Sequence, residues 1–191
     1  LPGIKACREV VDQIDWECEV HRKYQEKNYG CDPSEYISQK WAFSMVDKCI
    51  VLEDDDVPSV SFFTFCKEML DRYEQDTRIT MIAGFNNEEI TPDVPYDYFF
   101  ASTFSIWGWA SWKRVIDQWD EHYTFLEDTF NMQQLEQLMK ERKFRKDFIY
   151  MCHRHKENNK AYYETIFHAS MLFNSGLSIV PTRNMINNLG A

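Results

Sequence analysis

The residues best suited to chemistry are four consecutive carboxylates, which are Glu53, Asp54, Asp55 and Asp56. They follow a short apolar run, residues 49–52, whose β-branched centre predicts a buried strand. Pro58 prevents regular continuation of that strand, and Ser59 is suited to cap a helix that begins near Val60. We therefore expect the carboxylates at the C-terminal end of a core strand, where open α/β sheets bind their ligands.

This charge run must be hydrated or neutralised, because adjacent carboxylates repel one another. A divalent ion that also holds a diphosphate would neutralise it, and oxygen ligands suit Mg²⁺ or Mn²⁺. The other interpretation is a solvated acidic loop, which is the usual role of a short charge run. The rest of the sequence has to distinguish a metal site from a solvated loop.

The composition is that of a folded, acidic domain. The chain has 191 residues, of which 44% are hydrophobic and 16% aromatic, and this is enough to form the core of a single domain. The net charge of −10 argues against nucleic-acid binding and against docking on anionic lipid by charge alone. No apolar run approaches the roughly 18 residues of a membrane span.

The six cysteines are Cys7, Cys18, Cys31, Cys49, Cys66 and Cys152. No two of them form a C-x-x-C pair, which argues against a thiolate zinc site. Their even number leaves disulfides open, but several lie inside expected helices or strands, where reduced cysteine packs as a small apolar residue. We therefore favour a reducing compartment and a cytoplasmic protein, with peripheral attachment to the inner face of the membrane as an alternative.

Helical and strand patterns alternate along the chain, which predicts a layered α/β fold. Apolar residues at helical spacing predict helices over residues 4–14, 34–46, 60–73, 113–119, 130–150 and 160–173. Short apolar or alternating runs predict strands over residues 16–20, 49–52, 79–84, 98–101 and 177–181. Because a helix opens the chain, we expect that a strand preceding Leu1 has been lost.

A turn cluster, residues 27–33, precedes the second expected helix, which Ser34 is suited to cap. Asn28 and Gly30 suit the tight or left-handed backbone found next to ligands, although an ordinary loop has the same composition. A basic run over residues 140–146 could hold phosphates, but we favour a solvated helical face as its explanation.

Three tryptophans surround one glycine in the segment that contains Trp107, Gly108, Trp109 and Trp112. Their planar rings could stack on sugars or bases, and the glycine would permit close backbone approach. The same rings could simply pack in the core. Further along, Glu164 is a lone acid among apolar residues of an expected helix. An apolar setting raises the pKa of a carboxyl group, which suits a general base near neutral pH, whereas an exposed helical Glu would have no such role.

The order of these pieces resembles inverting glycosyltransferases of the GT-A fold. It is similar to the bacterial nucleotide-diphospho-sugar transferase-like proteins, some of which are described as hemolytic-protein homologues. More distantly, it resembles N-acetylglucosaminyltransferase I and related enzymes that build complex N-glycans. The segments that carry the resemblance are residues 49–55, Pro58, residues 62–63, 82–86, 99–100, 107–109, Trp112 and residues 174–181, with Asn184 and Asn187.

The resemblance implies one domain over residues 1–191, with a Rossmann-like mixed sheet flanked by helices. It also implies a first strand before the chain begins and a C-terminal His, often part of the metal site, after the chain ends. Asp55 would be the metal ligand, and the additional acid Asp56 could take that place if the register shifts by one. The expected donor-binding residues are Asn28, Gly30, Glu53, Asp54, Trp107, Gly108 and Trp109.

The catalytic base is the role that the resemblance assigns least directly. Its bacterial members carry a Trp-Asp segment where this chain has Tyr163-Glu164, so the carboxylate sits one methylene further out. A displacement of about 1 Å at a reacting centre can cost on the order of a hundredfold in rate. Asp120, which follows Trp119, is the competing candidate.

The implied reaction moves a sugar from a nucleotide diphosphate sugar, most naturally a UDP-sugar, to an acceptor hydroxyl with inversion. The acceptor would be a glycan or a lipid-linked molecule in cell-surface glycan synthesis. One rival is a nucleotidyltransferase or phosphatase-like Mg²⁺ enzyme, although the former usually has a Gly-rich basic phosphate loop, which this sequence lacks. The other is a catalytically degenerate domain that binds nucleotide sugars or carbohydrate.

Overall fold

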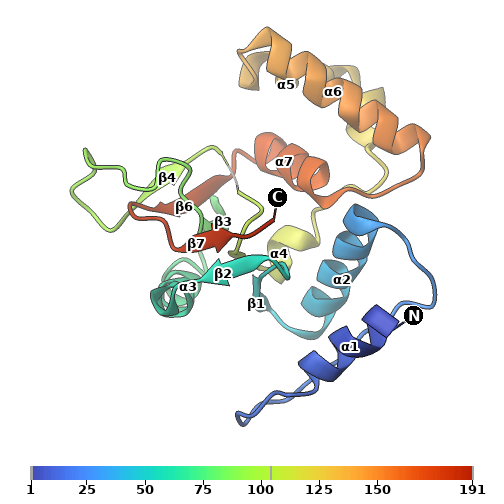
Figure 1. The fold of residues 1–191 in the computed structure, drawn as a ribbon. Coiled ribbons are helices and arrows are strands. Elements are labelled where there is room, and N and C mark those ends of the chain that lie inside the picture. Colours follow the sequence, from blue (N-terminus) through green and yellow to red (C-terminus); the bar gives the residue numbers. More distant parts are fainter. Residues whose placement is uncertain (1, 104, 191) are drawn as a thin grey trace.

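The computed structural model describes residues 2–103 and 105–190 and confirms a mixed α/β fold (Figure 1). The helices are α1 Pro2–Val11, α2 Cys31–Met45, α3 Val60–Arg72, α4 Lys113–Ile116, α5 Thr129–Leu138, α6 Arg142–Glu157 and α7 Tyr163–Phe173, with a 3₁₀ helix over Thr124–Glu127. The strands are β1 Lys48–Val51, β2 Asp56–Pro58, β3 Ile79–Ala83, β4 Tyr98–Ala101, β5 Trp109–Trp112, β6 Leu177–Pro181 and β7 Ile186–Asn188.

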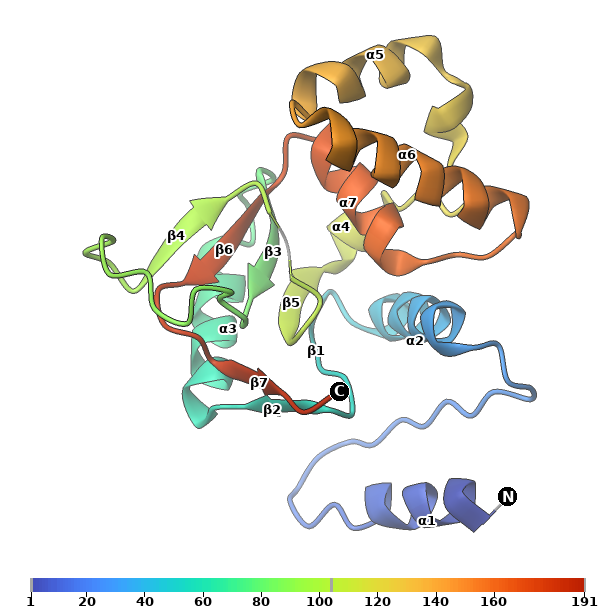
Figure 2. The same cartoon turned by 45° about the horizontal axis from the view of Figure 1, so that its top comes forward.

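Five of the strands form one mixed sheet in the order β1-β5-β3-β6-β4. Strands β1 and β3 both run antiparallel to β5, β6 runs parallel to β3, and β4 runs antiparallel to β6. The C-terminal ends of β1, β3 and β6 therefore lie at the same end of the sheet as the start of β5. The helical pair α5–α6 lies over α7, whereas α1 stands away from the sheet (Figures 1 and 2).

The centre of the sheet supplies most of the core. All residues of β3 and β5 are buried, and α3 covers this region with Phe62, Cys66 and Met69. Strand β1 is different from the expected core strand, because it lies at an edge of the sheet and its four residues are only half-buried. The carboxylates that follow it are therefore held at the sheet's margin.

The short strands β2, β5 and β7 were not among the expected elements. Asp56–Pro58 pairs antiparallel with Ile186–Asn188, so the chain continues as a strand up to Pro58 before α3 begins after Ser59. A proline is tolerated here because it is the last residue of a two-stranded ribbon. The pairing brings Asn188 opposite Asp56.

The expected strand over residues 16–20 is wrong, since this segment has no strand structure and Trp16 is 66% exposed. Alternating residues form a strand only where a partner strand can pair with them, and none is present among the described residues. The preceding helix is confirmed as α1, but no residue of it is buried.

Several helix boundaries also differ from expectation. Helix α2 starts at Cys31, so Gly30 rather than Ser34 is the N-cap, and Pro33 is accommodated in the first turn, where helix N–H groups lack partners. The expected helix 130–150 is two helices, because Glu141 caps α6 by accepting from the backbone N–H groups of Lys143 and Phe144. The helix expected from residue 160 begins at Tyr163.

The two adjacent phenylalanines of α3 provide a test of this core. Phe62 is fully buried at 0% exposure, whereas Phe63 is 44% exposed. We expect Phe62→Ala to lower the free energy of unfolding by about 3–5 kcal/mol, because it removes a large buried ring and leaves a cavity. Phe63→Ala should cost no more than about 1 kcal/mol. Urea denaturation measures both, and equal effects would contradict the assigned orientation of α3.

Candidate functional site

Asp56 fixes the turn that carries the other strand-end carboxylates. Its Oδ2 accepts from the backbone N–H of Glu53 at 3.1 Å and of Gly108 at 2.9 Å, and its Oδ1 accepts from Asn188 Nδ2 at 3.3 Å. These bonds tie the end of β1 to the start of β5 and to β7. The structure thus gives Asp56 an anchoring task, while its expected role as a metal ligand stays a prediction.

Gly108 belongs to the same anchor. Its φ of +58° is left-handed, and a Cβ at this position would lie 2.4 Å from Ile186 Cδ1. Its N–H is bonded to Asp56, and its carbonyl accepts from the N–H of Gly84 at 2.7 Å. The glycine is needed for this close backbone approach.

Asp55 is the strand-end carboxylate that lines a pocket, and it is the candidate cation ligand. It is half-buried, its Oδ1 accepts one bond from Asn188 Nδ2 at 3.1 Å, and its carbonyl accepts from the N–H of Leu189. It lines a pocket of about 540 Å³ together with Glu89, Asn184 and Asn188. The carboxylate oxygens of Asp55 and Glu89 are ligands that suit Mg²⁺ or Mn²⁺, whereas Asn188 faces Asp55 with its Nδ2 and uses its Oδ1 to accept from the N–H of Gly190. Asp54 lies exposed at the tip of the turn.

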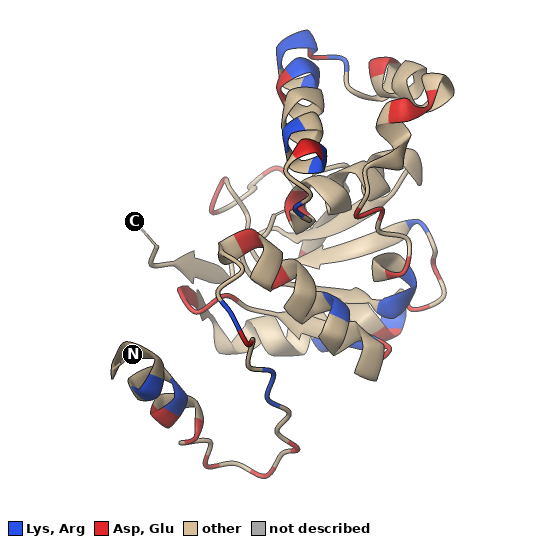
Figure 3. Cartoon of the chain, turned by 90° about the vertical axis from the view of Figure 1, so that its right-hand side faces the viewer, with Lys and Arg blue, Asp and Glu red and all other residues tan. Residues whose placement is uncertain are grey.

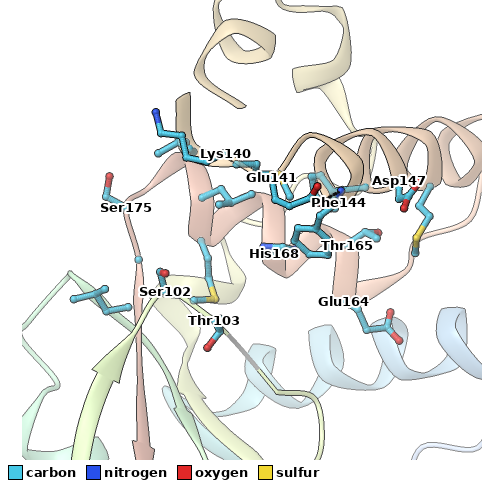
Figure 4. A pocket seen from close by; sticks show the side chains of 18 residues that line it. Ser102, Thr103, Lys140, Glu141, Phe144, Asp147, Glu164, Thr165, His168 and Ser175 are labelled. Carbon is cyan, nitrogen blue, oxygen red and sulfur yellow. Dashed lines mark hydrogen bonds between the residues drawn. The ribbon is translucent and has the colours of Figure 1, made fainter. Parts of the chain in front are cut away.

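Glu164 lies in the first turn of α7 and is half-buried. Burial raises the pKa of its carboxyl group to about 7, and the nearby charges of Asp32 and Glu35 act in the same direction. The side chain lines two neighbouring pockets, an apolar groove of about 820 Å³ (Figure 4) and a more polar pocket of about 790 Å³. A carboxylate with this pKa at a pocket wall is suited to accept a proton near neutral pH.

The acid cluster around Glu164 was not anticipated from the sequence. Asp32, Glu35 and Glu164 each offer an oxygen atom, and these atoms lie within 4.8 Å of one another. Asp32 and Glu35 are three residues apart on the first turns of α2, so a correct helix start would have placed them on one face. The three carboxylates offer a second place where a divalent cation could bind.

Glu53 connects the strand end to the Glu164 cluster. Its Oε1 accepts a hydrogen bond from Tyr163 Oη at 3.2 Å, and Tyr163 directly precedes Glu164. Burial raises the pKa of Glu53 to about 7, with a further contribution from the charge of Glu35, while the Tyr163 bond works in the opposite direction. If Glu53 contacts a nucleotide-sugar donor, as the sequence predicts, its carboxyl group would be held in place by the bond from Tyr163.

The rings of Phe85 and Trp107 form a wall that two pockets share. They meet edge to face, with centroids 4.7 Å apart and planes at 83°. Both line the pocket that contains Asp55 and the polar pocket that contains Glu164. The candidate metal ligand and the candidate base thus line neighbouring pockets with one aromatic wall between them.

Trp109 does not lie where the sequence suggested. It is fully buried at 0% exposure and stacks between Phe43 and Tyr163, at centroid distances of 6.4 and 6.3 Å. Its ring is therefore a core element, and the expected contact with a donor or acceptor is corrected. Of the three tryptophans around Gly108, Trp112 is also buried, which leaves Trp107 as the ring that faces the pockets.

The remaining sequence-predicted site residues make local contacts. The Asp120 carboxylate accepts from the N–H groups of His122 and Thr124 and from the Thr124 hydroxyl, so it caps its own turn. Asn28 Oδ1 accepts from the N–H of Gly30, whose φ is +90°. Asn28 and Gly30 precede α2, on the side of the acid cluster, and neither they nor Asp120 line the pockets described above.

All six cysteines are free thiols in the structure. Across residues 2–103 and 105–190, no helix has both the length and the apolar character needed to cross a membrane. Comparison with protein-family models gives no match, and a search of curated proteins finds no relative.

The raised pKa of Glu164 predicts a pH-dependent stability. The unfolded chain loses this proton near the ordinary value of 4.5, whereas the native state keeps it up to about pH 7. The native state binds more protons in that window, so stability falls as pH rises through it. Glu164→Gln should therefore stabilise the protein at pH 8, on the order of 1–3 kcal/mol, with a smaller difference at pH 4.

Urea denaturation at the two pH values measures this effect. Glu17→Gln is the matched control, because Glu17 is exposed and its replacement should change stability by less than about 0.5 kcal/mol at either pH. An effect of Glu164→Gln that is equal at pH 4 and pH 8 would contradict the assigned environment of the carboxyl group.

Proposed function

We propose that this protein is a metal-dependent inverting glycosyltransferase of the GT-A fold, which transfers a sugar from a nucleotide diphosphate sugar to an acceptor hydroxyl. The observation that carries the proposal is the placement of Asp55 and Glu164. One is a strand-end carboxylate that lines a pocket with Glu89, and the other is a half-buried carboxyl group with a pKa near 7. They line adjacent pockets that share the Phe85–Trp107 wall.

In this proposal the donor diphosphate binds on the Asp55 side of the wall. A divalent ion held by Asp55, with the Glu89 carboxylate lining the same pocket, would neutralise charge on the leaving diphosphate. Trp107 offers a ring face or edge against the transferred sugar. Asp54, exposed at the tip of the turn, is free to contact the nucleotide.

Glu164 acts as the general base on the other side of the wall. It accepts the proton of the acceptor hydroxyl while that oxygen attacks the anomeric carbon and the bond to the diphosphate breaks. A single displacement of this kind inverts the anomeric centre, as in inverting glycoside hydrolysis with an acceptor in place of water. The Tyr163–Glu53 hydrogen bond positions the first turn of α7, and hence Glu164, relative to β1.

Nucleotide binding tests the proposal first. We expect UDP to bind in the presence of Mn²⁺ and at least tenfold more weakly in its absence, as measured by calorimetry. Asp55→Asn should abolish the metal-dependent part, because it removes the charged ligand. Asp15→Asn, at an exposed position of the N-terminal segment, should bind like the wild type. If neither UDP nor another nucleoside diphosphate binds with either metal, the proposal is wrong.

Turnover separates an enzyme from a binding domain of the same fold. With a UDP-sugar and a panel of glycan and lipid acceptors, kcat should rise with pH through about 7, because the carboxylate form of Glu164 is the active base. Glu164→Gln should lower kcat by about 10²–10⁴ and leave the affinity for UDP within twofold. Metal-dependent UDP binding without turnover of any UDP-sugar would identify a degenerate nucleotide-sugar-binding domain instead.

A further inference from the structure

The apolar groove continues far beyond Glu164. It runs beside α7 from Glu164 to Ser175, and Figure 4 shows Glu164 at one end and Lys140 with Ser175 at the other. At about 1.5 Å per residue this span is about 16 Å. Its apolar lining comes from α5, α6 and α7 and consists chiefly of Leu138, Met139, Phe144, Phe148, Met151 and Leu172. The proposed reaction uses only the Glu164 end.

Three of these apolar side chains are poorly covered in the structure. Phe144 is 56% exposed, Met151 46% and Leu138 41%, and all three line the groove. They come from two different helices, α5 and α6, which lie above α7 (Figure 2). Covering them with an apolar ligand would be favourable, because it removes apolar surface from water.

The charged side chains that line the groove lie toward its two ends. Lys140 and Glu141 lie at the end far from Glu164, while Asp147 lies toward the Glu164 end (Figure 4). Lys140 makes no ion pair within the described parts of the chain, nor do Lys143 and Lys146 of α6. The start of α6 is correspondingly basic (Figure 3).

Cations in the first turns of a helix oppose its dipole, so this basic run does not serve helix stability. The backbone N–H groups at the start of α6 are already taken by the Glu141 side chain, which caps the helix. An anion at this end of the groove would therefore be bound by the side chain of Lys140, the lysine that lines it. The charges thus favour a ligand whose far end is negative.

We propose that the groove binds the acceptor, and that the acceptor is a hydroxylated long-chain anion. Its hydroxyl lies at Glu164, its hydrocarbon body covers Phe144, Met151 and Leu138, and its anionic end meets Lys140. A span of about 16 Å corresponds to a chain of about ten to twelve carbons. This assignment rests on the proposed function, because it makes Glu164 the base that deprotonates the hydroxyl, and it narrows the acceptor from glycans to hydroxylated lipids.

Calorimetry with ω-hydroxydecanoate, used below its micellar concentration and without nucleotide, tests the groove directly. We expect saturable binding, at least tenfold weaker for decane-1,10-diol, which lacks the anion, and for 6-hydroxyhexanoate, which is too short. Phe144→Asp should weaken binding at least tenfold. Tyr150→Asp is the matched control, because Tyr150 is 61% exposed on the same helix but does not line the groove.

Two further variants keep the test independent of the folding of Phe144→Asp. Leu138→Asp introduces the same charge from α5 and should have the same effect. Lys140→Glu should weaken ω-hydroxydecanoate at least fivefold and leave the diol unchanged, whereas Lys160→Glu, at an exposed position outside the groove, should change neither. Circular dichroism confirms that each variant is folded.

The same samples are titrated with UDP and Mn²⁺, so that the two proposals fail separately. If UDP binds but ω-hydroxydecanoate does not, or if Phe144→Asp and Leu138→Asp leave its affinity unchanged, the acceptor assignment is overturned and the transferase proposal stands. If ω-hydroxydecanoate binds but no nucleoside diphosphate does, both are overturned. Binding of both ligands, with sugar transfer to the ω-hydroxyl that Glu164→Gln abolishes, supports the assignment.

Discussion

The hydrogen bond from Tyr163 to Glu53 holds together the two parts on which the site depends. Glu53 follows the edge strand β1, and Tyr163 opens α7, which is 110 residues further along the chain. Tyr163 is fully buried, and its ring stacks on Trp109 and Trp119 in the core. A polar side chain buried this deeply needs a partner, and its bond to Glu53 fixes where α7 begins relative to the strand end. The next residue, Glu164, is positioned by the same contact.

The order and direction of the strands place the segment before β5 next to the strand-end carboxylates. Because β1 and β3 run in the same direction on either side of β5, the segment before β5 lies between the two strand ends. Asp56 links the end of β1 to the segment before β5 through its bond to the N–H of Gly108. The ring of Trp107, the preceding residue, contacts the ring of Phe85. The carboxylates of residues 53–56 are thereby divided among different tasks. Asp56 anchors the turn, Glu53 accepts the hydrogen bond of Tyr163, and Asp55 remains for a ligand.

Local patterns predicted the elements that form the core, including α3, β3 and β6, because their apolar periodicity reports burial directly. They were less informative about β5, where Trp109 and Trp112 are buried and suggested sugar stacking, since a tryptophan-rich run looks the same in a core and in a binding site. The strand expected over residues 16–20 depended on a partner that local sequence cannot reveal. The apolar neighbours of Glu164 in the sequence predicted a raised pKa for its carboxyl group. Its acidic neighbours Asp32 and Glu35 belong to α2, which is distant in sequence, so local patterns did not predict them.

The location of a bound metal tests the central claim most directly. Crystals grown with Mn²⁺ and UDP would reveal the ion by its anomalous scattering. We predict a peak beside the Asp55 carboxylate, on the opposite side of the Phe85–Trp107 wall from Glu164. A peak within the cluster of Asp32, Glu35 and Glu164 instead would contradict it, because Glu164 would then be a metal ligand and could not serve as the base.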